Sequence, residues 1–83
     1  MASKQELEEF KFRVEVLLST AEALLMDIRK SLALMPDKVG DMTYMKLEIN
    51  EAKLEGEIKV LESHLARVNS ALAEYGEVGN INE

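Results

Sequence analysis

The sequence predicts an all-α fold, in which two long antiparallel helices form a coiled-coil-like helical hairpin. Three observations support this prediction. Pro36, the only proline, divides the 83-residue chain near its middle. On both sides of it, apolar residues recur at alternating spacings of three and four, the heptad pattern of helices that pack lengthwise. Alternating apolar and polar residues between turn residues, which would predict a β-strand, are missing from the sequence.

The first helix is expected over residues 4–35. Ser3 and Glu6 fit a capping box, in which each side chain binds the free backbone amide of the other residue. Pro36 disfavours helical geometry at Met35, so the helix is expected to end there. Its inward-facing line is expected at the heptad a and d positions, and three leucines at e positions widen this line. The a and d residues are Leu7, Phe10, Val14, Leu17, Ala21, Leu24 and Ile28, and the e residues are Leu18, Leu25 and Leu32.

The second helix is expected to begin at Asp41, a favourable N-cap, with Thr43 as the alternative. Gly76 is a favourable residue to end it. The single domain, 1–83, thus comprises a first helix (4–35), a loop (36–40), a second helix (41–75) and a flexible tail (76–83). The inward-facing line of the second helix is Tyr44, Leu47, Leu54, Ile58, Leu61, Leu65, Val68, Leu72 and Tyr75.

The short loop makes the two helices antiparallel neighbours, so facing residues should have nearly constant number sums. The apolar lines satisfy this condition. Leu7 with Leu72, Phe10 with Val68, Val14 with Leu65, Leu17 with Leu61, and Ala21 with Ile58 all sum to 78 or 79. The agreement of both lines in one register supports a hairpin more strongly than either line alone.

A chain of this length buries only about 60% of its unfolded surface, so its stability alone is marginal. The sequence has no Cys and one His, so no disulfide and no conventional zinc site is expected. A partner or a second copy is therefore expected to complete a bundle with the hairpin.

The charge balance bears on the kind of partner. Sixteen acidic residues stand against ten basic ones, giving a net charge of −6, which disfavours nucleic acid and anionic membrane surfaces. No apolar run approaches the roughly 20 residues of a membrane span. The acidic opening, Ser3 to Glu9, lacks the pattern of a signal or transit peptide. We expect a cytoplasmic protein.

Each helix carries a second set of residues outside the expected contact. Phe12, Val16, Ala23 and Met26 follow one line of the first helix, roughly opposite the inward-facing line. They are either scattered surface residues or a second, partner-binding interface. Small residues on the second helix, among them Ala52, Gly56 and Ser63, are either ordinary exposed residues or a groove for a partner helix, which could receive Phe12 and Met26 of another copy.

The polar residues of the sequence form no pattern that predicts a catalysed reaction. Glu51, at an a position, either reaches water near the loop or is a buried group that a partner satisfies. His64 is expected to be partly exposed, and Glu55 is expected to pair with Lys59 one turn away. No catalytic, cofactor-binding or metal-binding residue is predicted, and no small-molecule substrate, because no phosphate loop, calcium loop or catalytic triad is recognisable.

The chain resembles one family on short segments spread over most of its length. These are Leu7-Glu8-Glu9 at the start, Gly40-Asp41 at the turn, the aromatic Tyr44, and Ala52-Lys53-Leu54-Glu55. They are similar to the type III secretion needle co-chaperones, the YscE/PscE/AscE group of helical hairpins. Members of that family are somewhat shorter. The resemblance implies a non-enzymatic protein that pairs with a second co-chaperone and helps to keep a needle subunit from polymerising.

The sequence therefore predicts a non-enzymatic protein–protein interaction module, with a small co-chaperone that pairs with a helical partner in a bacterial secretion system as its specific form. The alternative is a homo-oligomeric structural or adaptor protein, for example of phage or bacterial origin, that has no chaperone role.

Overall fold

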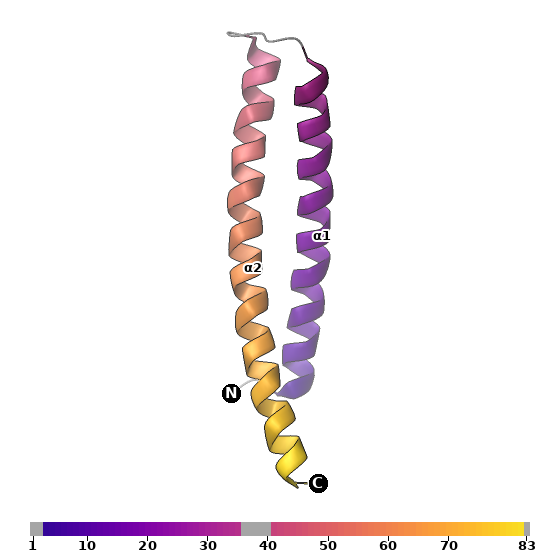
Figure 1. Ribbon diagram of the computed structural model, residues 1–83, viewed down its shortest axis with the longest axis vertical. Coiled ribbons are helices and arrows are strands. Elements are labelled where there is room, and N and C mark those ends of the chain that lie inside the picture. The colour runs from indigo at the N-terminus through magenta and orange to yellow at the C-terminus, as the bar shows by residue number, and fades with distance from the viewer. Residues whose placement is uncertain (1–2, 36–40, 83) are drawn as a thin grey trace.

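The computed structural model is a hairpin of two helices that lie side by side along nearly their whole length (Figure 1). It describes residues 3–35 and 41–82, with side chains as far as Tyr75. Helix α1 spans Lys4–Leu34 and helix α2 spans Met42–Asn82, and no strand occurs among the described residues. The molecule measures 62 × 19 × 14 Å. The all-α hairpin is confirmed, and the expected loop at 36–40 lies outside the described residues.

Local sequence signals set both ends of α1. The Ser3 hydroxyl accepts a hydrogen bond from the Glu6 amide at 3.1 Å, and the Glu6 carboxylate accepts one from the Ser3 amide at 3.2 Å. This reciprocal pair is the expected capping box. At the other end, Met35 adopts φ −81° and ψ 135°, an extended conformation. Helical geometry is therefore already lost at the residue before Pro36, as a following proline requires.

Asp41 caps the start of α2. Its carboxylate accepts hydrogen bonds from the amides of Thr43 at 2.8 Å and Tyr44 at 3.3 Å. Thr43 lies inside the helix, so Asp41 and not the alternative is the N-cap.

The expected end of this helix at Tyr75 is wrong, because α2 continues through Gly76 to Asn82. Glycine permits a helix to end but does not impose it. In a helix interior it costs only about 1 kcal/mol relative to alanine. No proline follows Gly76 in the sequence to stop the helix.

The residues that face the other helix follow the expected line on α2 but not on α1. On α2, Val68 is buried, and the other expected residues from Leu54 to Tyr75 are half-buried. On α1, three expected d residues are largely exposed: Phe10 at 45%, Leu17 at 57% and Leu24 at 50%. Beside Leu17 and Leu24, the e-position residues Leu18 and Leu25 face α2 instead. The inward-facing line of α1 is Leu7, Val14, Leu18, Ala21, Leu25, Ile28 and Leu32.

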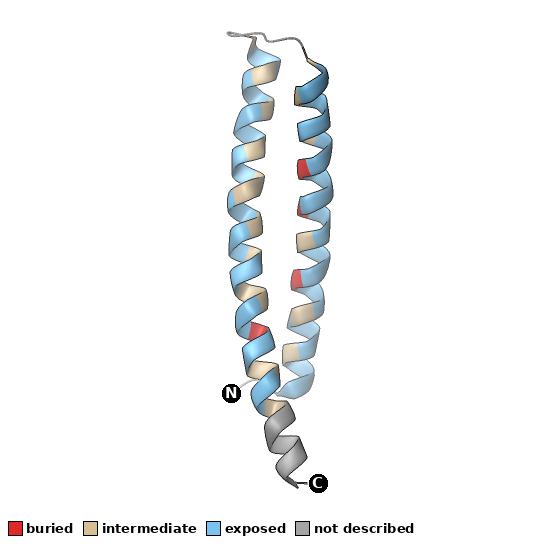
Figure 2. Cartoon of the chain, viewed as in Figure 1, coloured by how far each residue is buried: buried red, intermediate tan, exposed pale blue. Residues whose placement is uncertain are grey.

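The different inward-facing line of α1 has a geometric cause. In its two middle heptads, helix α1 is apolar at a, d and e, a stripe wider than one neighbouring helix covers. Helix α2 covers the a and e side and leaves the d side in water. The core is correspondingly small: among the described residues, only Val14, Ala21, Leu25 and Val68 are buried, along a narrow line between the helices (Figure 2).

Candidate functional site: an apolar groove between the helices

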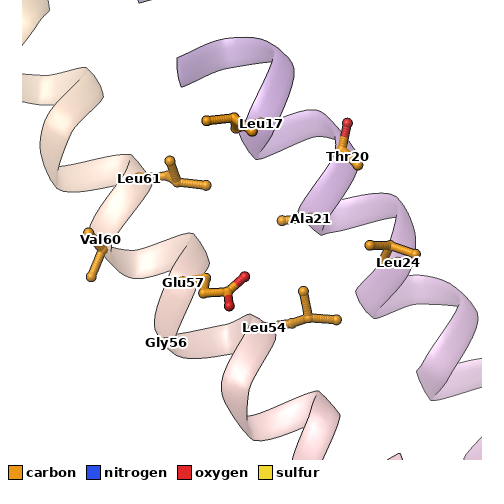
Figure 3. Close-up of a pocket in the computed structure, with 9 residues that line it drawn as sticks. All are labelled: Leu17, Thr20, Ala21, Leu24, Leu54, Gly56, Glu57, Val60 and Leu61. Carbon is orange, nitrogen blue, oxygen red and sulfur yellow. The ribbon is translucent and has the colours of Figure 1, made fainter. Parts of the chain in front are cut away.

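An open groove runs along one side of the hairpin, between the middle parts of α1 and α2 (Figure 3). Its volume is about 700 Å³. The lining is mainly aliphatic. It consists of Leu17, Thr20, Ala21 and Leu24 from α1, and Leu54, Gly56, Glu57, Val60 and Leu61 from α2. Glu57 carries the only charge in this lining.

The uncovered side of α1 supplies one wall of the groove. Leu17 and Leu24 stand at the d positions that α2 does not cover, and Val60, 57% exposed, belongs to the part of the lining that α2 supplies. Thr20 lies between the two leucines, and its hydroxyl donates a hydrogen bond to the Val16 carbonyl at 3.0 Å. The hydroxyl is therefore satisfied within the helix, and Thr20 adds little free polarity to the wall.

The groove keeps the antiparallel register that the sequence predicts. Leu17 and Leu61, whose numbers sum to 78, line it from opposite helices, and so do Leu24 and Leu54 (Figure 3). The residues that lie at the same height along the two helices are therefore the expected ones. These leucines form the walls of an open groove, whereas the sequence places them in a closed contact.

Gly56 stands at the rim of the groove on α2. A Cβ atom placed there meets nothing within 4 Å. No contact within the chain therefore requires glycine at this position. Because Gly56 has no side chain, the α2 edge of the groove is lower there than at Val60 and Leu54.

The opposite side of the hairpin is held by charges. Arg29 of α1 donates hydrogen bonds to the carboxylates of Glu51 at 3.2 Å and Glu55 at 2.8 Å, which form two ion pairs across the helices. The hydrogen bond that Arg29 donates to Glu55, followed by the one that it donates to Glu51, raises the pKa of Arg29. Glu51 is therefore satisfied within the chain. The expected pair of Glu55 with Lys59 is not formed, because Glu55 binds Arg29 across the hairpin instead.

His64 packs against Phe10, with ring centroids 6.2 Å apart and the planes at 88°. This edge-to-face geometry is the favourable one for aromatic rings. His64 is half-buried, as expected for a residue that flanks the contact. Phe10 stands one heptad before Leu17, so the pair extends the uncovered line of α1 towards the start of the helix.

The structure does not bring the seven predicted partner-binding residues into one site. All seven are exposed: Phe12, Val16, Ala23 and Met26 on α1, and Ala52, Gly56 and Ser63 on α2. Phe12 lies in a shallow hollow beside Glu8 and Arg13, and Met26 lies in a separate one beside Arg29. Only Gly56 lines the groove.

Sequence reasoning missed the groove residues Leu17, Leu24 and Val60. The signal for the first two was present, because the two heptads that contain Leu17 and Leu24 are apolar at a, d and e, which exceeds what one partner helix buries. Val60 follows no apolar line with its neighbours, so the pattern alone does not find it.

Among the described residues, no group of three or more His, Cys, Asp or Glu side chains is placed to hold a metal ion. In the same residues, neither helix is both long and apolar enough to cross a membrane. Comparison with known proteins gives no match, whether to a family model, a curated protein or a solved structure.

Proposed function

We propose that this chain is a non-enzymatic protein-binding module, and that the groove receives an apolar face of a helix from another protein molecule. The observation that carries the proposal is the exposure of Leu17, Leu24 and Val60 around one groove. Burying a large aliphatic side chain contributes roughly 1.5–3 kcal/mol. Three such side chains can therefore offset a large part of the entropic cost of association.

A helix is the occupant that fits the shape of this site. The groove runs lengthwise between two antiparallel helices, and a third helix laid along it would meet both walls. Leu17 and Leu24 are one heptad apart, which is about 10.5 Å along the axis. Apolar residues spaced by a heptad on the incoming helix match this distance, as in other helix-in-groove complexes.

Two finer forms of the proposal follow from the sequence. The resemblance to type III secretion needle co-chaperones supports a hetero-partner, a second helical co-chaperone, and a role in keeping a needle subunit unpolymerised. The alternative is a homo-oligomeric bundle protein. A cytoplasmic location belongs to both forms, and the lack of Cys in the sequence supports it.

A matched pair of variants tests the groove. Leu24→Asp places a charge in the groove, and Phe12→Asp places the same charge on the outer face of α1, where the side chain is 67% exposed. Each is used, beside the parent, in sedimentation and as bait in an extract of the native source. Circular dichroism on the same samples shows whether the helices remain.

We expect Phe12→Asp to behave like the parent and Leu24→Asp to lose association while it keeps its helix content. Loss with Phe12→Asp alone would place the binding surface on the outer face instead. If the parent neither self-associates nor retains a protein that Leu24→Asp loses, the proposal is wrong.

A further inference from the structure

We propose that the occupant of the groove is a second copy of this chain, which docks with its α1 antiparallel to the first α1 and forms a four-helix bundle. This inference rests on the proposed function of the groove and names its partner. It is carried by the exposed area of the chain, by the spacing of the groove-side residues of α1, and by their charges.

The chain exposes more surface than a compact monomer of its mass. The accessible surface is 6434 Å², whereas a compact monomer of 9.3 kDa exposes about 5,000 Å². The excess is larger than the roughly 800 Å² that one partner contributes to an interface of standard size. A second copy seated on the groove would cover Leu17, Leu24 and Val60 of both chains at once.

The groove side of α1 is complementary to itself when reversed. Its residues alternate at spacings of three and four: Phe10, Arg13, Leu17, Thr20, Leu24, Asp27 and Ser31. Two antiparallel copies of this line, related by a twofold axis near Thr20, match at number sums of 40 and 41. Leu17 then faces Leu24 of the second copy, and Thr20 faces its own equivalent.

The same register pairs the charges. Arg13 of one copy faces Asp27 of the other, and the symmetry makes this pair twice. Both residues are exposed, and the only ion pairs among the described residues are those of Arg29. The two charges that flank the leucines are therefore available to a second copy, and they have opposite signs where the register needs them.

The other twofold arrangement of two hairpins is less favourable. It places the start of α2 of both copies at the same end and lays α1 over α2 of the second copy in the register of the hairpin itself. Arg13 would then meet the level of residue 65. Residues 63–67 include no acid and include Arg67. The charges therefore select the arrangement with α1 antiparallel to α1.

Charge reversal tests the partner and the register together. Arg13→Asp and Asp27→Arg each turn two attractive pairs into two repulsive ones, so each should raise the dimer dissociation constant about tenfold. The double variant R13D/D27R restores both pairs and should return to within about threefold of the parent. Lys30→Asp, an equal change of charge at an exposed position on the outer face, is the control and should have no such effect.

Cross-linking tests the direction. The chain has no Cys, so Thr20→Cys introduces a single thiol beside the proposed twofold axis. It should form a disulfide-linked dimer efficiently under mild oxidation. In Ser31→Cys the two thiols would lie about 30 Å apart, and no intradimer cross-link should form.

Three results would overturn the inference. One is a parent that stays monomeric at high micromolar concentration. The second is a dimer that R13D/D27R does not restore, and the third is a dimer in which Thr20→Cys fails to cross-link. In the first case, capture of another protein that Leu24→Asp abolishes would leave the proposed function of the groove standing with a different partner.

Discussion

Leu24 and Leu25 are adjacent leucines, yet Leu24 is half exposed and Leu25 is buried. One step along a helix rotates a side chain by about 100°, enough to move it from the contact with α2 to the wall of the groove. Because both are leucine, residue type cannot distinguish them. Only the position of the neighbouring helix decides which leucine forms the core and which remains for a partner.

Gly56 lowers the stability of α2 without making a contact that requires glycine. Gly56→Ala should raise the free energy of unfolding by about 1 kcal/mol, because alanine favours the helix and the added Cβ meets nothing within 4 Å. Urea unfolding followed by circular dichroism measures this change. Ala52→Gly, at an exposed position on the same helix, is the reverse control and should lower the free energy by a similar amount. A destabilised Gly56→Ala would show a close approach at the groove that the isolated chain lacks.

The ion pairs of Arg29 are expected to contribute little to stability. Its ion pairs with Glu51 and Glu55 are largely exposed, so Arg29→Gln should lower stability slightly at low salt, and the difference should vanish at high salt. Thermal unfolding at the two salt concentrations measures it. A loss that persists at high salt would show that the aliphatic part of Arg29, and not its charge, holds the helices.

The helices themselves were largely predictable from the sequence, and the reasons are local. Three signals depend only on neighbours in the sequence: the capping box at Ser3, the cap at Asp41 and the break before Pro36. They can therefore be predicted without knowing where the other helix lies. The end of α2 was not predictable in the same way, because Gly76 permits two outcomes. The side of α1 that α2 covers was not predictable either, since a, d and e are all apolar.

The side of α1 that α2 covers and the side that faces the groove should respond differently to substitution. Val14 is 3% exposed, so Val14→Asp places an unpaired charge in the core and should unfold the hairpin. Leu17→Asp should keep the helix content and lose only association, because its side chain faces the groove. Circular dichroism and sedimentation on both variants make the comparison. Equal loss of helix in both would mean that folding requires the groove to be filled.

At the scale of the whole molecule, a thin two-helix rod with four buried side chains among the described residues is expected to gain stability from association. If folding and docking are linked, the thermal midpoint of the parent should rise with protein concentration. The midpoint of Leu24→Asp should stay constant over the same range. Differential scanning calorimetry over a hundredfold range of protein concentration tests this. A constant midpoint for the parent would show that the hairpin is stable alone.

We propose that another protein molecule covers the groove and not the outer face of α1. Methyl NMR with a soluble paramagnetic agent measures this most directly. As the chain is concentrated, or as its partner is added, the methyl groups of Leu17, Leu24 and Val60 should become protected, while those of Val16 and Met26 stay accessible. Protection of Val16 and Met26 with Leu17 and Leu24 still exposed would show that the partner covers the outer face of α1 and not the groove.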